Sequence, residues 1–138
     1  MEMLLGVVDR FPGSPTLIKY TFYALSNYVA CGKKYSMKFV EVGGGEALKI
    51  LGEVLNPGSA SSRPITSDIY SEAMWVLVNM ITTARDDIVV SLLLNHQHTW
   101  ILSAFEKCLS GNISEKVLLQ SIIDALISIL QAEVPVSY

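Results

Sequence analysis

Residues 69–82 read IYSEAMWVLVNMIT, and this stretch is the clearest indication of the fold class. Its apolar side chains recur at offsets of three and four residues, as at Ala73, Leu77 and Ile81. That spacing gathers them on one face of an α-helix. Residues 17–29 and 117–129 show the same spacing. Since no stretch alternates strictly between apolar and polar residues, as a half-buried strand would, the sequence predicts an all-α protein.

Glycine, proline and short polar residues divide the chain into about eight predicted helices, a helix pair followed by two triplets. Each triplet has a short, a middle and a long member. We expect the first triplet at 34–42, 46–55 and 66–83, and the second at 86–95, 99–109 and 114–133. A helical unit that recurs at this scale is typical of an α-solenoid, in which each unit packs only on its neighbours.

The long helices align as YALSNYV (23–29), WVLVNMI (75–81) and DALISIL (124–130), which begin 52 and 49 residues apart. Helical repeats are ordinarily about 40–47 residues long. The excess falls in residues 56–67, which are rich in Pro, Gly and Ser and which we interpret as a surface loop. The alignment predicts one domain over 1–138, with a partial repeat at 1–32, full repeats at 33–83 and 84–133, and a tail at 134–138.

The segment SEAMWVLVN (71–79) resembles the EAxWxxxN helix that recurs in the armadillo repeats of the importin α family, which are adaptors of nuclear import. The segment KYTFYALSN (19–27) is similar to the same helix, with Tyr in place of Trp, and LLQSIIDALISILQAE (118–133) is similar to the final repeat. The resemblance covers nearly the whole chain. It implies an armadillo/HEAT-like right-handed α-solenoid of about two and a half repeats.

The same resemblance implies a function, the binding of basic nuclear-localisation peptides in a concave groove lined by aromatic and Asn side chains. Residues four apart share a helix face, so Trp75 lies beside Asn79 and Tyr23 beside Asn27. An Asn amide offers a donor and an acceptor to any peptide backbone, and an aromatic face attracts Lys or Arg. The residues implied as peptide-binding are Tyr23, Ser26, Asn27, Glu72, Trp75, Asn79, Asp124 and Ser128.

This chain departs from the family pattern at several of these positions. Tyr20 stands where an acidic residue is expected one turn before Tyr23, and Tyr23 itself replaces Trp. In the last helix Asp124 and Ser128 stand in place of the aromatic residue and Asn. These departures leave a second interpretation open, an armadillo scaffold or assembly protein whose groove holds a non-basic protein partner. A HEAT-like regulatory subunit would share the architecture but would not explain the aromatic–Asn pairs.

Further partners and the location in the cell also follow from the resemblance: the import and export receptors, and both cytoplasm and nucleus. A net charge of −3, with ten scattered Lys and Arg, disfavours nucleic-acid binding. Membrane spanning is disfavoured because no apolar run reaches about 20 residues. The apolar helix expected at 3–11 indicates truncation, a bound partner or self-association through the end helices.

Other candidate sites have ordinary structural explanations. We expect Trp100 to pack in the core, and the same alternative applies to Trp75. His96 and His98 lack a nearby third ligand for a metal. Cys31 and Cys108 lack a His partner for nucleophilic catalysis.

The remaining acidic and glycine motifs are also explained without chemistry. The pair at 86–87 suits a helix start, where carboxylates complement the dipole. The glycines at 43–45 are not followed by the GK[ST] of a phosphate loop. The sequence therefore predicts a protein that is not an enzyme and that uses no metal and no cofactor.

Overall fold

The computed structural model describes residues 2–42, 45–56, 66–93, 100–112 and 115–131. Within these ranges all regular secondary structure is helical, which confirms the predicted all-α class. The elements are α1 (Glu2–Arg10), α2 (Pro15–Ala30), α3 (Lys33–Glu41), α4 (Glu46–Leu55), α5 (Ser67–Leu93), α6 (Trp100–Lys107), the π-helical turn η3 (Cys108–Asn112) and α7 (Lys116–Gln131).

Local signals in the sequence set several helix ends. Ser14 caps α2, because its hydroxyl accepts a hydrogen bond from the Leu17 amide at 3.4 Å, and Pro15 follows at the first helical position, where no amide hydrogen is needed. Gly45 precedes α4 with a φ of 99°, a conformation that favours glycine. The predicted helix at 46–55 is confirmed with these bounds.

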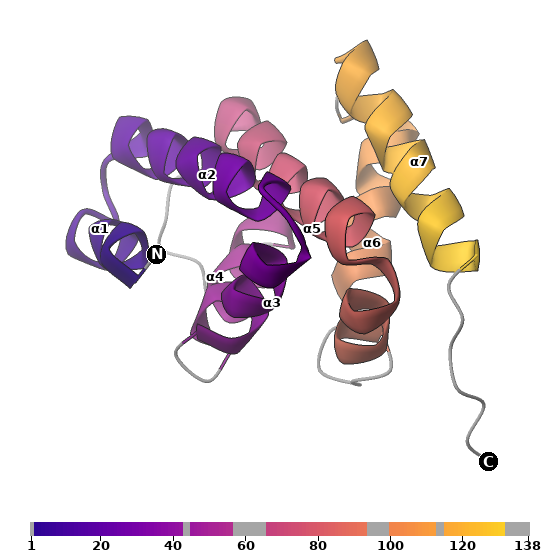
Figure 1. Cartoon of the computed structure of the whole chain (residues 1–138). Helices are drawn as coiled ribbons and strands as arrows, with labels where there is room; N and C mark the ends of the chain where they lie inside the picture. The colour runs from indigo at the N-terminus through magenta and orange to yellow at the C-terminus, as the bar shows by residue number, and fades with distance from the viewer. Residues whose placement is uncertain (1, 43–44, 57–65, 94–99, 113–114, 132–138) are drawn as a thin grey trace.

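Two of the expected helices are joined in α5. The element continues from Ser67 to Leu93, but Arg85 leaves the helical region with φ 20° and ψ −106°. The chain bends there, and the two parts of α5 run in different directions (Figure 1). The predicted boundary at residues 84–87 is therefore confirmed as a kink between a long and a short helix. The expected end of the short helix at 95 lies outside the described residues.

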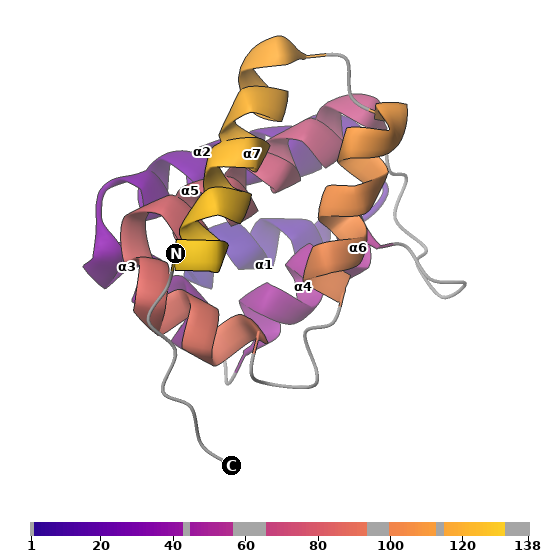
Figure 2. The same ribbon diagram turned by 90° about the vertical axis from the view of Figure 1, so that its right-hand side faces the viewer.

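The long helices form one side of the molecule. From left to right in Figure 1, α2, the first part of α5 and α7 follow one another, and α5 packs on both α2 and α7. On the other side, α4 packs on α5 and α6, and α3 packs on α2, α4 and α5. Figure 2 shows α7 crossing in front of α5 from a second direction. Large buried side chains fill the core between the two sides, among them Phe22, Phe39, Leu51, Leu77 and Phe105.

The second triplet is described in part, because the residues at several of its expected ends lie outside the described ranges. The middle helix, expected at 99–109, is α6 followed by η3, and the last helix, expected at 114–133, is described as Lys116–Gln131. The indole of Trp100 packs against Gly52 of α4, so its predicted packing role is confirmed. None of the helices in the described ranges combines the length and the apolar character that a membrane span requires.

Candidate functional site

The outer face of α2 carries two of the predicted contact residues. Tyr23 is 54 % exposed, and Asn27, one turn later, is also exposed. Tyr20 is exposed one turn before Tyr23. The opposite face of the helix holds Phe22, Leu25 and Val29 in the core. The prediction that Tyr23 and Asn27 face outward is thus confirmed, because the apolar positions of α2 turn these two away from the core.

The equivalent residues of α5 lie deeper. Glu72, Trp75 and Asn79 are all half-buried, and Trp75 packs in part against the core. α5 is covered on both sides by α2 and α7, whereas α2 has a long-helix neighbour on one side. The Trp75 indole and the Asn79 amide are therefore partly exposed to solvent. They line a surface between α2 and α7.

Asn79 has a structural role in addition to any binding role. Its Nδ2 donates a hydrogen bond to the Ser26 carbonyl of α2 at 3.2 Å. One turn further, the Thr83 and Ser36 hydroxyls lie 2.7 Å apart, and both lie within hydrogen-bond distance of the Val29 carbonyl, at 3.2 and 3.0 Å. These side chains hold the C-terminal end of α2 against α3 and α5. One N–H of the Asn79 amide is used inside the fold, which leaves its second N–H and its Oδ1 for a ligand.

Ser26 does not belong to the candidate surface. Its side chain is buried, and its hydroxyl donates to the Tyr23 carbonyl at 2.7 Å. The position corresponds to Val78 in the alignment of the long helices, and Val78 is buried as well. Both positions face the contact between α2 and α5. In the sequence, the alignment of Ser26 with the apolar Val78 already indicated a buried position. That match could have excluded Ser26 from the predicted site.

In α7 the helix phase differs by one residue from the alignment DALISIL (124–130). The buried residues Leu118, Ile122 and Ala125 match Ile18, Phe22 and Leu25 of α2 with a constant shift. With that shift, Tyr23 and Asn27 correspond to Ile123 and Ile127, which are 50 % and 45 % exposed.

The sequence alignment instead paired Tyr23 and Asn27 with Asp124 and Ser128. That alignment matches Ala-Leu at 24–25 with Ala-Leu at 125–126. The buried residues of α7 show instead that the helix is turned by one residue from this match. Asp124 is exposed, and the Ser128 hydroxyl, which is half-buried, donates to the Asp124 carbonyl at 3.1 Å. Neither residue takes the place of the aromatic or the Asn of the other two helices.

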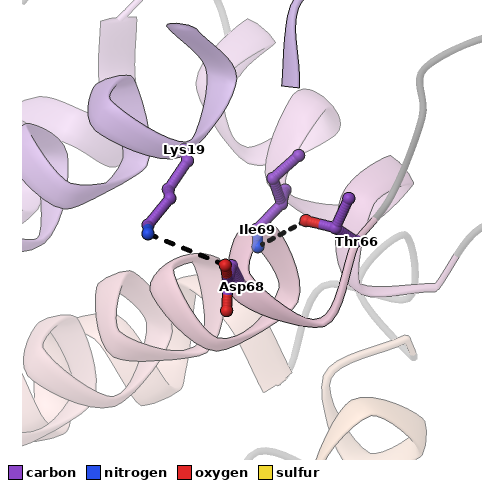
Figure 3. A network of polar contacts seen from close by, with 4 residues as sticks. All are labelled: Lys19, Thr66, Asp68 and Ile69. Atoms are coloured by element: carbon purple, nitrogen blue, oxygen red, sulfur yellow. Dashed lines mark hydrogen bonds and ion pairs between the residues drawn. The ribbon is translucent and has the colours of Figure 1, made fainter. Parts of the chain in front are cut away.

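A group of charges missed by the sequence reasoning surrounds Glu72. Burial raises the pKa of Glu72, Lys19 lowers it, and Glu115 and Asp68 raise it further. Lys19 also forms an ion pair with Asp68, with 3.7 Å between Nζ and Oδ2 (Figure 3). Thr66 fixes the start of α5 beside this pair by accepting a hydrogen bond from the Ile69 amide at 3.2 Å. Asp68 and Glu72 of α5 thus lie near Lys19 of α2, and Glu115, just before α7, adds a negative charge that acts on Glu72.

The described residues hold no cluster of three or more His, Cys, Asp or Glu that could bind a metal ion. His96 and His98 lie outside the described residues. Cys31 is exposed at the end of α2, while Cys108 is buried, and burial raises the pKa of its thiol. Of Asp86 and Asp87, the second pairs with Lys33 of α3 and so joins α3 to the second part of α5.

Comparisons with known proteins add no further assignment: no family model, no curated protein and no solved structure matches this chain.

Proposed function

We propose that the chain is an armadillo-type α-solenoid of about two and a half repeats, related to the importin α family, which binds a basic segment of another protein. The observation that carries the proposal is the pair of aromatic–Asn steps on adjacent helices, Tyr23 with Asn27 and Trp75 with Asn79, next to an excess of carboxylates. The same proposal gives the protein a role in nuclear transport, in cytoplasm and nucleus, with import and export receptors as further partners.

The order of helix contacts supports the solenoid. The long helices α2, α5 and α7 follow one another on one side, and the middle helices α4 and α6 contact each other on the other side. Polar contacts recur between neighbouring units. Asn79 bonds to Ser26 between two long helices, and Lys107 Nζ donates to Asn56 Oδ1 at 2.8 Å between two middle helices. Contacts between successive units in both layers are what a solenoid requires.

The surface has the chemistry for an extended cationic peptide. An exposed tyrosine and a half-buried indole offer two ring faces, each worth roughly 0.5–2 kcal/mol to a Lys or Arg side chain. Asn27 and the Asn79 Oδ1 can bond to a peptide backbone whatever its sequence. Asp68, Glu72 and Glu115 provide three negative charges against the single charge of Lys19. The surface therefore favours cations and extended backbones together.

The proposal is tested by titrating the protein into a fluorescein-labelled lysine-rich peptide and following the anisotropy. Trp75→Ala should raise the Kd about tenfold, because the loss of a cation–π contact of about 1–2 kcal/mol corresponds to that factor. The matched control is Tyr35→Ala, an exposed aromatic residue on α3 whose ring contacts Tyr28 rather than the proposed surface. The proposal fails if the wild type shows no saturable binding or if the two substitutions weaken it equally.

A second candidate is the armadillo scaffold with a non-basic partner, and one observation favours it. The exposed side of α7 carries Ile123, Ile127 and Leu130, where a groove for basic peptides would carry polar or aromatic residues. An adjacent hollow between α6 and α7 is lined largely by Leu102, Phe105, Leu109 and Leu126. Tighter binding of a peptide rich in aliphatic residues and free of Lys and Arg, unaffected by Trp75→Ala, would favour this candidate. Self-association through the end helices stays a prediction, which light scattering tests.

Glu72→Gln should stabilise the protein at neutral pH and weaken peptide binding at the same time. The pKa of Glu72 is raised on folding, so its ionised form disfavours the folded state at any pH above that raised pKa. Gln mimics the protonated form. The gain should be below about 1 kcal/mol, since much of the carboxyl is solvated, and it should vanish as the pH falls below about 4, where glutamate is protonated even in the unfolded chain.

Urea unfolding at a series of pH values measures this gain, with Glu106→Gln, an exposed acid on α6, as the control. A residue that lowers stability while strengthening binding is typical of a functional site. The prediction is wrong if Glu72→Gln is less stable than the wild type at pH 7.

A further inference from the structure

Lys19 places a positive charge of this chain inside the acidic part of the proposed surface. Its Nζ lies 3.7 Å from Asp68 Oδ2 and 6.0 Å from the centroid of the Tyr20 ring. Of the charges that act on Glu72, that of Lys19 is the strongest. Figure 3 shows the side chain reaching from α2 across to the start of α5. The ammonium thus has carboxylates and an aromatic ring around it, the surroundings proposed for a cation of the bound peptide.

The contact that holds Lys19 there is weak enough to be replaced. The side chains of Lys19 and Asp68 are 40 % and 71 % exposed, and one N–O distance of 3.7 Å is long for a charge-assisted hydrogen bond. Exposed ion pairs of this kind contribute little to stability, because solvent screens them and ordering two long side chains is unfavourable. Lys19 can therefore leave Asp68 and Glu72 without unfolding any element.

We propose that Lys19 is an intramolecular competitor that occupies the cation position of the surface until a basic ligand displaces it. This inference rests on the proposed function. A ligand with a single cation exchanges one ammonium for another and gains little. A ligand with several neighbouring Lys or Arg displaces Lys19 and also uses the remaining charge of Asp68, Glu72 and Glu115. Lys19 thus sets the number of positive charges that a peptide needs for binding.

The test compares Lys19→Met, which keeps the apolar stem and removes the charge, with Lys49→Met, an exposed lysine on α4 with the same change in net charge. Fluorescein-labelled peptides with one lysine and with five lysines are titrated with each protein. Lys19→Met should bind the one-lysine peptide up to about fivefold more tightly than wild type, because an exposed ion pair is worth at most about 1 kcal/mol, and the five-lysine peptide more tightly by a smaller factor. Lys49→Met should resemble wild type with both peptides, and thermal unfolding followed by circular dichroism checks that each variant folds.

The possible results separate the two proposals. If Lys19→Met and Lys49→Met have equal effects, or if Lys19→Met binds more weakly than wild type, Lys19 is no competitor. The proposed function then still holds, provided that Trp75→Ala weakens binding of the five-lysine peptide. If neither wild type nor Lys19→Met binds either peptide, both proposals fail. The double variant Lys19→Met/Asp68→Asn should lose most of the gain, because it removes a carboxylate that Lys19 vacates.

Discussion

Replacing Gly52 by alanine is expected to lower the free energy of unfolding by about 1–3 kcal/mol, the usual effect of overpacking a filled interface. A Cβ at this position would lie 2.9 Å from Cε2 and 3.0 Å from Nε1 of Trp100. The obstacle is a rigid indole packed against the core, so it cannot swing aside as the end of a flexible side chain can. To accept the methyl group, α4 and α6 would have to move apart, which would loosen the contact between the middle helices of the two triplets.

Gly6→Ala is the matched control for this substitution. Gly6 lies within α1, and a Cβ there meets nothing within 4 Å. Since alanine favours a helix over glycine by about 1 kcal/mol, Gly6→Ala should raise stability while Gly52→Ala lowers it. Urea unfolding followed by circular dichroism measures both. If both substitutions stabilise the protein equally, α4 and α6 are not in contact through Gly52 and Trp100. The proposed solenoid would then lose one of the helix contacts that favour it.

Ile122→Ala should lower the free energy of unfolding by about 2–5 kcal/mol, as is usual when a fully buried aliphatic side chain is truncated. Ile122 is 0 % exposed, whereas its neighbour Ile123 is 50 % exposed. The same substitution at Ile123 removes the same atoms but leaves no cavity, so its effect should stay below about 1 kcal/mol. Chemical denaturation of the two variants gives the comparison directly.

The difference between these two variants also tests the helix phase of α7. A larger effect at Ile122 places Ile123 and Ile127 at the positions of Tyr23 and Asn27. The opposite order would turn the helix by about one residue and restore Asp124 and Ser128 to the positions that match Tyr23 and Asn27. The result therefore bears on whether the third long helix offers apolar or polar contacts to a partner.

The amino-acid sequence alone was sufficient for the fold class and for most helix boundaries. The apolar period of residues 69–82 predicted a long helix, and the helix boundary expected after residue 83 matches the kink at Arg85. The start of α2 is likewise set locally, by Ser14 and Pro15. These features depend on interactions within a few residues along the chain, such as capping hydrogen bonds and the spacing of side chains on one helix. Local interactions of this kind can be read from a single sequence.

The tertiary structure alone decided which predicted contact residues reach the surface. It buried Ser26, used one amide N–H of Asn79 to bind α2, and brought Lys19 to the acids of α5. It also turned α7 so that Ile123 and Ile127, rather than Asp124 and Ser128, match Tyr23 and Asn27. Neighbouring residues on a helix point about 100° apart, so an error of one residue in alignment replaces one face by another. The true rotation of each helix is fixed by the helices packed around it, which lie up to about fifty residues away in the chain.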